Sequence, residues 1–189
     1  FVNLMSHFSG IWKDDLLVLE TFLETIDYKT ATDRLQAYGI KRSEGGSVTL
    51  GFTNRGKMSK TKCREFCPIK KKYKTKLMAE RPELLEMLEQ FRDTWFPCYQ
   101  FDSAQLNRNY KIPPHRDKGN IGDSVIVCCG EFTGGELVVN VDDDNISFRP
   151  DKQPVVFNGS KHTHWVKEFE GLRYSVVFFK SRFWKPDTD

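Results

Sequence analysis

The stretch Asn107-Arg-Asn-Tyr-Lys-Ile-Pro-Pro-His-Arg-Asp-Lys118 lies near the start of a part of the chain that is rich in short, strand-like runs. Its triplet His115-Arg-Asp117 places an imidazole and a carboxylate two residues apart. On an extended backbone such residues project to the same side, because strand side chains alternate with a period of two. The pair could therefore share one metal ion, and a third ligand would have to come from elsewhere in the chain.

From Tyr99 onward, short apolar runs alternate with turns, and no helical pattern interrupts them. Consecutive strands without intervening helices favour an antiparallel sandwich or barrel over a parallel α/β sheet. We therefore expect an α+β, mainly β fold: a jelly roll with helices packed on one outer face. The runs that fit strands are 99–110, 114–117, 123–130, 135–141, 145–149, 153–158, 162–168 and 172–180.

Two helices and one strand are expected before this region. Residues 13–27 and 82–95 both place large apolar side chains at helical spacing. Pro82 suits the first position of the second helix, where its missing N–H costs nothing. Residues 47–53 alternate apolar and polar side chains after a pair of glycines, which predicts a strand.

The 189 residues, of which 39% are hydrophobic, are enough to bury a core without disulfides or structural zinc. We expect a single domain over residues 1–189. Its N-terminal part, 1–98, holds the helices and a basic segment, and residues 99–180 form the β core.

The five cysteines are an odd number with no repeated CxxC spacing, which argues against a disulfide framework and against a zinc finger. No apolar run approaches the ~18 residues that a membrane helix requires, and the first residues lack the pattern of a signal peptide. We expect an intracellular protein in a reducing compartment, with the nucleus as one candidate, and no membrane partner.

The basic segment, residues 55–81, carries eleven lysines and arginines against two glutamates, a net charge of +9 in a chain whose total is +3. Such a block on an otherwise acidic chain is typical of a polyanionic partner, most commonly nucleic acid. A solvated segment that only improves solubility explains the charge equally well. Its run KKKYKTK is too polar to pack, and Lys70, Lys71 and Lys72 are our candidates for contact with a nucleic-acid backbone.

Candidates for the third ligand are His162 and His164, which share the run KHTHWVKEF. Either would complete a two-histidine-one-carboxylate set, which leaves open positions on Fe(II) for a bidentate cosubstrate and oxygen. Nine residues after His164, Arg173 begins an apolar run and shares a strand face with Ser175. A guanidinium buried in an apolar strand is costly without an anion, so these two side chains are expected to hold a carboxylate.

In order and spacing, His115-x-Asp117, His164 and Arg173-x-Ser175 resemble the motifs of the Fe(II)/2-oxoglutarate dioxygenases. The resemblance implies a double-stranded β-helix, with His115, Asp117 and His164 as the iron ligands that carry catalysis. It implies that Arg173 and Ser175 bind the distal carboxylate of 2-oxoglutarate. The nine-residue spacing to the arginine matches the superfamily and favours His164 over His162. The cofactors implied are Fe(II), 2-oxoglutarate and O2, with succinate and CO2 as products beside the oxidised substrate.

The stretch LNRNYKIPPHRDKGNIGDSVIVCCGEFTGGELVV is most similar to the TET/JBP branch, which oxidises the methyl group of 5-methylcytosine or thymine in nucleic acid. The matching features are Asn107-x-Asn109, Asn120-x-Gly122-x-Ser124 and the turn Phe132-Thr-Gly-Gly-Glu-Leu137. The likeness implies a nucleic-acid partner, DNA more than RNA. Asn107 also resembles the asparagine that bonds 2-oxoglutarate in AlkB-type repair dioxygenases, which makes Asn107 and Asn109 candidates for cofactor binding. The cysteine-rich zinc module of animal TET proteins is absent.

A base that is oxidised in a duplex must leave the stack and enter an aromatic slot with polar groups at its pairing edge. Asp123 and Ser124, just past the first two ligands, are candidates for that slot, as are Tyr110 and Trp165. A turn aspartate and core-packed aromatic residues are the simpler interpretation.

Three other functions remain open. A prolyl- or lysyl-type protein hydroxylase has the same triad and a similar Gly-Gly turn. An AlkB-like demethylase would carry a further arginine six residues past Arg173, where this chain has Phe179. In a metal-free β-sandwich that binds nucleic acid, the histidines would be incidental.

Overall fold

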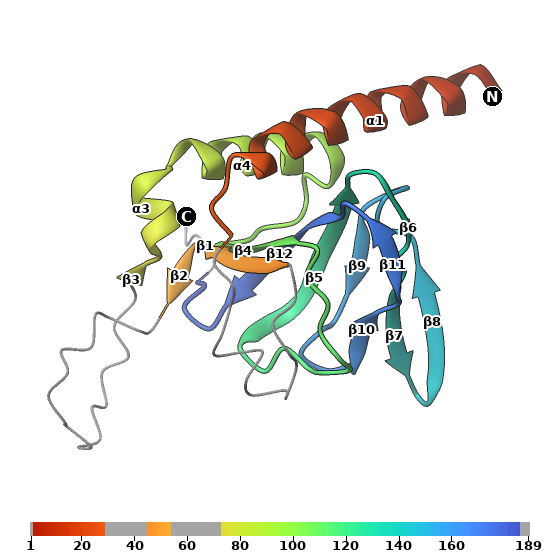
Figure 1. The fold of residues 1–189 in the computed structure, drawn as a ribbon. Helices are drawn as coiled ribbons and strands as arrows, with labels where there is room; N and C mark the ends of the chain where they lie inside the picture. Colours follow the sequence, from red (N-terminus) through yellow and green to blue (C-terminus); the bar gives the residue numbers. More distant parts are fainter. Residues whose placement is uncertain (1, 29–44, 54–72, 186–189) are drawn as a thin grey trace, which may run out of the picture.

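The computed structural model describes residues 2–28, 45–53 and 73–185 (Figure 1). Its helices are α1 (Val2–Glu24), α3 (Lys76–Glu80) and α4 (Glu83–Trp95). Its strands are β1 (Gly46–Leu50), β2 (Phe52–Thr53), β3 (Tyr73–Lys74), β4 (Ser103–Arg108), β5 (Asn120–Cys129), β6 (Phe132–Gly134), β7 (Leu137–Val141), β8 (Asp144–Phe148), β9 (Val155–Phe157), β10 (His164–Val166), β11 (Phe169–Gly171) and β12 (Tyr174–Ser181).

Two antiparallel sheets form the body of the fold. The larger sheet has the order β1-β4-β12-β5-β9 and the smaller has the order β10-β7-β8. Buried apolar residues of β5 and β9 pack against those of β7, so the two sheets enclose a small core between them. The short pairs β6 with β11 and β2 with β3 lie outside these sheets. The expectation of a mainly antiparallel β fold is confirmed.

Helices α1 and α4 cover the outer face of the larger sheet (Figure 1). Alternate residues of β12 decide this packing, because Val176 and Phe178 point to the helices while Ser175 and Val177 point between the sheets. The expected helices are confirmed with shifted ends. Helix α1 begins at Val2, and Pro82 is the N-cap of α4 rather than its first residue.

Two local expectations are wrong. Residues 114–117 are not a strand, since only an isolated bridge pairs His115 with His164. The run 162–168 becomes a strand only at His164, because His162 lies in the bend before β10. At the end of the run KKKYKTK, β3 pairs with β2, and Lys74 and Lys76 are exposed. Lys70, Lys71 and Lys72 lie outside the described residues.

Within the described part of the chain, no helix has the length and hydropathy needed to cross a membrane. The cysteines described there, Cys98, Cys128 and Cys129, are all free thiols.

Phe178 is the residue whose truncation should most weaken the contact between helices and sheet. Its ring is fully buried and meets the rings of Phe96 and Phe101 edge-on, at centroid distances of 5.1 and 5.0 Å. We expect Phe178→Ala to lower the free energy of unfolding by about 3–5 kcal/mol, as measured by urea denaturation. Val156→Ala on the exposed side of β9 is the control, with an expected change within about 0.5 kcal/mol. Equal effects of the two substitutions would contradict this account of the core.

Candidate metal centre

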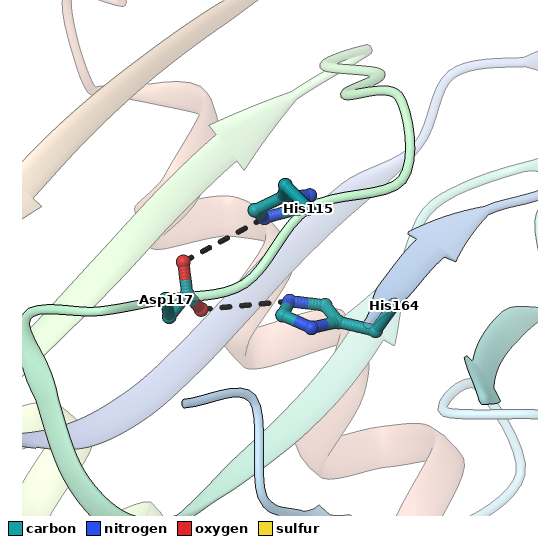
Figure 2. Close-up of side chains that lie close together, drawn as sticks. All are labelled: His115, Asp117 and His164. Atoms are coloured by element: carbon teal, nitrogen blue, oxygen red, sulfur yellow. Dashed lines mark ion pairs between the residues drawn. The ribbon is translucent and has the colours of Figure 1, made fainter. Parts of the chain in front are cut away.

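His115, Asp117 and His164 converge at one end of the space between the sheets (Figure 2). One ligand atom from each residue lies within 4.8 Å of the others. The Asp117 carboxylate stands between the two rings, with Oδ1 3.6 Å from His115 Nε2 and Oδ2 3.5 Å from His164 Nε2. The two histidines are therefore not incidental to the fold: they are brought to one carboxylate from positions about fifty residues apart in the sequence.

The backbone fixes both imidazoles. His115 and His164 exchange two main-chain hydrogen bonds, of 3.1 and 3.0 Å. Each ring also has Nδ1 close to a carbonyl oxygen two residues earlier, that of Pro113 at 2.9 Å and that of His162 at 3.1 Å. A carbonyl can only accept, so Nδ1 is the donor to it in each ring and Nε2 faces the Asp117 carboxylate. Nε2 can donate to Asp117 when it carries a proton, and it can bind a cation once that proton is lost.

The carboxylate of Asp117 is held in its charged form. Burial by itself would raise its pKa, but the adjacent imidazoles of His115 and His164 outweigh burial and hold the pKa well below the usual range of a carboxyl group. Its main-chain N–H donates to the carbonyl oxygen of Gly159 at 2.8 Å. Two neutral imidazoles and one carboxylate carry a net charge of −1 and fit a divalent first-row metal such as Fe(II).

Gly159 has no side chain that would crowd the His164 and Asp117 ligands. A Cβ at this position would stand 3.0 Å from His164 Cε1 and 3.2 Å from Asp117 Oδ2. We expect Gly159→Ala to displace both side chains and to lower metal affinity by roughly 10- to 100-fold, the range found for lost supporting contacts in metal sites. The measurement is a calorimetric titration with Fe(II) under anaerobic conditions.

Gly119→Ala is the matched control, since its Cβ would meet only the end of the Arg182 side chain, at 3.5 Å. An affinity that is unchanged in Gly159→Ala, or lowered equally in both variants, would contradict the role assigned to Gly159.

The three ligands open onto a cavity of about 90 Å³ between the sheets. Four polar side chains of the larger sheet line it: Gln105, Asn107, Asn120 and Ser175. The rest of the wall is largely apolar or aromatic. Its aromatic residues include Tyr110, Phe157, Trp165 and Phe179.

A directed row of hydrogen bonds crosses β1, β4 and β12 beneath this wall. The Thr49 hydroxyl donates to Gln105 Oε1 at 2.7 Å, and Gln105 Nε2 donates to Ser47 Oγ at 2.5 Å. Ser47 then donates to Asn107 Oδ1 at 2.6 Å, and Asn107 Nδ2 donates to Ser175 Oγ at 3.1 Å. The row ends on Ser175, which keeps its own proton to donate. This wall therefore favours a ligand that accepts hydrogen bonds, such as a carboxylate.

Arg173 lies on the same strand face as Ser175 but does not line the cavity. Its side chain is only 2% exposed and packs between the rings of Phe132 and Phe169, each 5.5 Å from Cζ. Nη2 donates to the carbonyl oxygen of Gly135 at 3.2 Å and to Cys128 Sγ at 3.0 Å.

The charge of Arg173 has no anionic partner among the described residues. Nε is buried and makes no hydrogen bond, and no carboxylate there pairs with the guanidinium. Burial raises the pKa of the Cys128 thiol to about 11, so the sulfur is neutral. Such a buried cation is costly unless an anion reaches it.

The turn at Gly134-Gly135 makes room for this arginine. Both glycines have positive φ, 76° and 72°, as the sequence predicts for a tight turn. A Cβ on Gly135 would stand 2.9 Å from Arg173 Nε.

Asn109 acts on the backbone of Arg173 and does not line the cavity. Its Oδ1 accepts from the Arg173 N–H at 2.7 Å, and its own N–H donates to the Arg173 carbonyl oxygen at 2.8 Å. Its φ of 45° is one that asparagine tolerates better than most residues. The structure thus separates the two asparagines, with Asn107 at the cavity and Asn109 holding the start of β12.

The candidate substrate residues also separate. Trp165 and Tyr110 line the cavity, whereas Asp123 and Ser124 do not. Asp123 is exposed, and its carboxylate accepts a hydrogen bond from Asn158. Ser124 is fully buried in β5 and its hydroxyl has no partner.

Sequence reasoning missed Gln105, Phe157 and Phe179 as wall residues, whereas Asn120 belongs to the stretch 119–124 that is expected to line the slot. Alternation along β4 could have found Gln105, which lies two residues before Asn107. Asn120 stands near the Asp117 carboxylate, with Nδ2 3.5 Å from Oδ2. Phe179 occupies the position where AlkB enzymes have their further arginine.

No family model and no curated protein matches the chain. Many solved structures resemble it, and three serve as examples. The first is an oxidoreductase of the 2OG-Fe(II) oxygenase family from Burkholderia pseudomallei, with 20% identity, a TM-score of 0.59 and coverage of 88% of this chain and 78% of that one. The second is NgTET1 in complex with 5mC DNA, with 14% identity, a TM-score of 0.50 and coverage of 87% and 68%. The third is a prolyl-4-hydroxylase from Pseudomonas putida, with 15% identity, a TM-score of 0.51 and coverage of 90% and 88%.

These likenesses define the fold, which is the jelly roll found in 2OG-Fe(II) oxygenases. Within that fold, the described residues of this chain bring together a two-histidine-one-carboxylate group that could hold a metal ion.

Proposed function

We propose that this protein is an Fe(II)- and 2-oxoglutarate-dependent dioxygenase that oxidises the methyl group of a nucleic-acid base, with 5-methylcytosine or thymine in DNA as the first candidates. The observation that carries the proposal is the convergence of His115, Asp117 and His164 beside a cavity with donors on one wall and aromatic rings around it. The Nε2 atoms of His115 and His164 and the Asp117 carboxylate suit Fe(II), and three protein ligands leave other coordination positions of the metal open.

The chain's own residues would do three things. His115, Asp117 and His164 hold the metal, which with 2-oxoglutarate and O2 supplies the oxidising power for the reaction. Ser175 and Asn107 donate hydrogen bonds to the cosubstrate, and Arg173 supplies the positive charge that its distal carboxylate requires. The aromatic wall excludes water and orients the substrate carbon.

Three observations support a base as the substrate. Rings of Tyr110, Trp165 and Phe179 line the cavity, and flat rings are what a base leaving its stack can pack against. The motif from Asn107 to Leu137 is similar to the TET/JBP branch. Residues 55–81 carry a net charge of +9, which suits a polyanion.

Product identification tests the proposal directly. The protein, loaded anaerobically with Fe(II) and 2-oxoglutarate, should show a metal-to-ligand charge-transfer absorption band. After exposure to air and methylated DNA, nucleoside mass spectrometry should show a hydroxymethyl base together with succinate. Absence of both the band and succinate from folded protein would overturn the enzyme proposal.

A protein hydroxylase is the second candidate, because the fold is as similar to the Pseudomonas putida prolyl-4-hydroxylase as to NgTET1. Hydroxylation of a peptide library in place of DNA would move the assignment to that class. Loss of a methyl group from an alkylated base would instead support an AlkB-like demethylase.

A further inference from the structure

A second hollow adjoins the cavity of the candidate metal centre. The two share Gln105 and Phe179 in their walls, so they lie next to each other. It encloses about 460 Å³ and is lined by residues of β1, β2, α3, β4 and the end of β12. We call it the Phe183 groove, after the aromatic residue that follows β12.

Flat apolar rings form part of the groove. Phe52, Phe179 and Phe183 all line it and all remain partly exposed. Such rings offer stacking surfaces to unpaired bases, which bind aromatic side chains with little dependence on sequence.

Two cations, Lys76 and Arg182, also line the groove, and no carboxylate does so among the described residues. Among the described residues, Lys76 pairs only with the exposed Glu80, at 3.4 Å, and such a surface ion pair contributes little stability. Arg182 has no ion pair with a described carboxylate, and its Nη2 lies 3.5 Å from the place of a Cβ on Gly119. Arg182 therefore lies beside Gly119, two residues beyond Asp117.

The described end of the basic segment borders the groove, since Thr75, Lys76 and Leu77 line it. Strands β2 and β3 pair with each other beside α3 at one end of the molecule (Figure 1), and Phe52 and Thr75, next to the ends of residues 54–72, line the groove. In sequence, those residues hold eight lysines and arginines against Glu65 alone. This positive charge in the sequence, like that of Lys76 and Arg182 in the groove, favours a polyanion as the partner.

We propose that the Phe183 groove binds the nucleotides that flank the reacting base, and that it selects single-stranded over double-stranded nucleic acid. Rings alternating with cations suit bases that are already unstacked and phosphates that follow them, whereas a duplex keeps its bases paired and offers only its backbone. The identity of the reacting group in the cavity rests on the proposed function. The groove itself can be tested on protein without metal.

The test is fluorescence anisotropy with a labelled single-stranded oligothymidylate and its duplex with oligoadenylate, across a range of salt concentrations. The wild-type protein should bind the single strand more tightly. The double variant K76Q/R182Q should lose affinity and lower the slope of log K against log salt by about 1.4, since each phosphate contact on a single strand contributes about 0.7. Phe183→Ala should weaken binding by roughly 5- to 150-fold with little change in that slope.

Lys13→Gln is the control, because Lys13 is an exposed residue of α1 that does not line the groove. The substitution removes one positive charge elsewhere on the surface. Affinity and salt slope of K76Q/R182Q equal to those of Lys13→Gln would overturn the proposal, as would tighter binding of the duplex. Displacement of the oligonucleotide by polyglutamate at equal charge concentration would overturn it in favour of an acidic peptide. If the wild-type protein shows no charge-transfer band but the variants still lose oligonucleotide binding, the groove stands and the dioxygenase proposal fails.

Discussion

Replacing His164 by alanine is expected to abolish succinate formation and to remove tight binding of Fe(II). His164 supplies one of three ligand atoms that lie within 4.8 Å of each other, and its ring is almost completely buried. Loss of a contact that only supports a metal ligand costs roughly 10- to 100-fold in affinity, and loss of the ligand itself should cost more. Anaerobic titration with Fe(II), followed by the charge-transfer band with 2-oxoglutarate, measures this effect.

Thermal unfolding gives a second measure that does not require turnover. A ligand present at 100 times its Kd stabilises the folded state by about 2.7 kcal/mol. For a chain of this length that corresponds to a rise in Tm of roughly 5–10 °C for the wild-type protein with Fe(II) under anaerobic conditions. His164→Ala should show no such rise.

His162→Ala is the matched control, since it removes an imidazole two residues away. His162 lies in the bend before β10 and takes no part in the group of ligands. Only its carbonyl oxygen contacts the site, at 3.1 Å from His164 Nδ1, and alanine keeps that carbonyl. Metal binding and turnover should therefore persist in His162→Ala. The opposite result, with His162→Ala inactive and His164→Ala active, would make His162 the ligand.

The spacing of the ligands was informative even though the local structure expected for them was not. His115 and Asp117 lie on a loop with a single bridge to His164 rather than on a strand. Their side chains still converge, because His115 pairs with His164 and the Asp117 N–H donates a hydrogen bond to the carbonyl oxygen of Gly159. Alternation therefore predicted correctly that the His115 and Asp117 side chains converge, although these residues lie on a loop and not on the strand that was expected. The strand expected over 162–168 begins only at His164, so His162 lies outside it.

The sequence does not show how deeply a side chain on a strand lies between the sheets. Alternation places Arg173 and Ser175 on one face of β12, and the structure agrees. It does not say that the strand enters a closed end of the sandwich at Arg173, where Phe132, Phe169 and Gly135 surround the guanidinium. Those residues come from other strands and turns, so only the tertiary fold reveals them. The row of hydrogen bonds from Thr49 to Ser175 could not be predicted either, because its residues come from three different strands.

Replacing Arg173 by methionine is expected to separate stability from function. The guanidinium is buried without an anionic partner among the described residues, so a neutral side chain of similar length should leave the metal-free protein as stable as the wild type or more so. If the distal carboxylate of 2-oxoglutarate pairs with Arg173, its removal should cost about 2–5 kcal/mol of cosubstrate binding. That corresponds to a rise of roughly 30- to 4,000-fold in the KM for 2-oxoglutarate. Urea denaturation and succinate formation measure the two effects.

Arg173→Lys and Ser175→Ala are the controls that identify the cause. Lysine keeps the charge but not the planar fork, so its KM should lie between those of the wild-type protein and the methionine variant. Ser175→Ala removes one neutral donor, and it should cost only about 0.5–1.5 kcal/mol of binding. A purely structural arginine, held by its aromatic neighbours, predicts the reverse pattern: Arg173→Met would unfold at lower urea while the KM of the folded enzyme stayed unchanged. Because the two accounts differ in the sign of the stability change and in the KM, one pair of measurements decides between them.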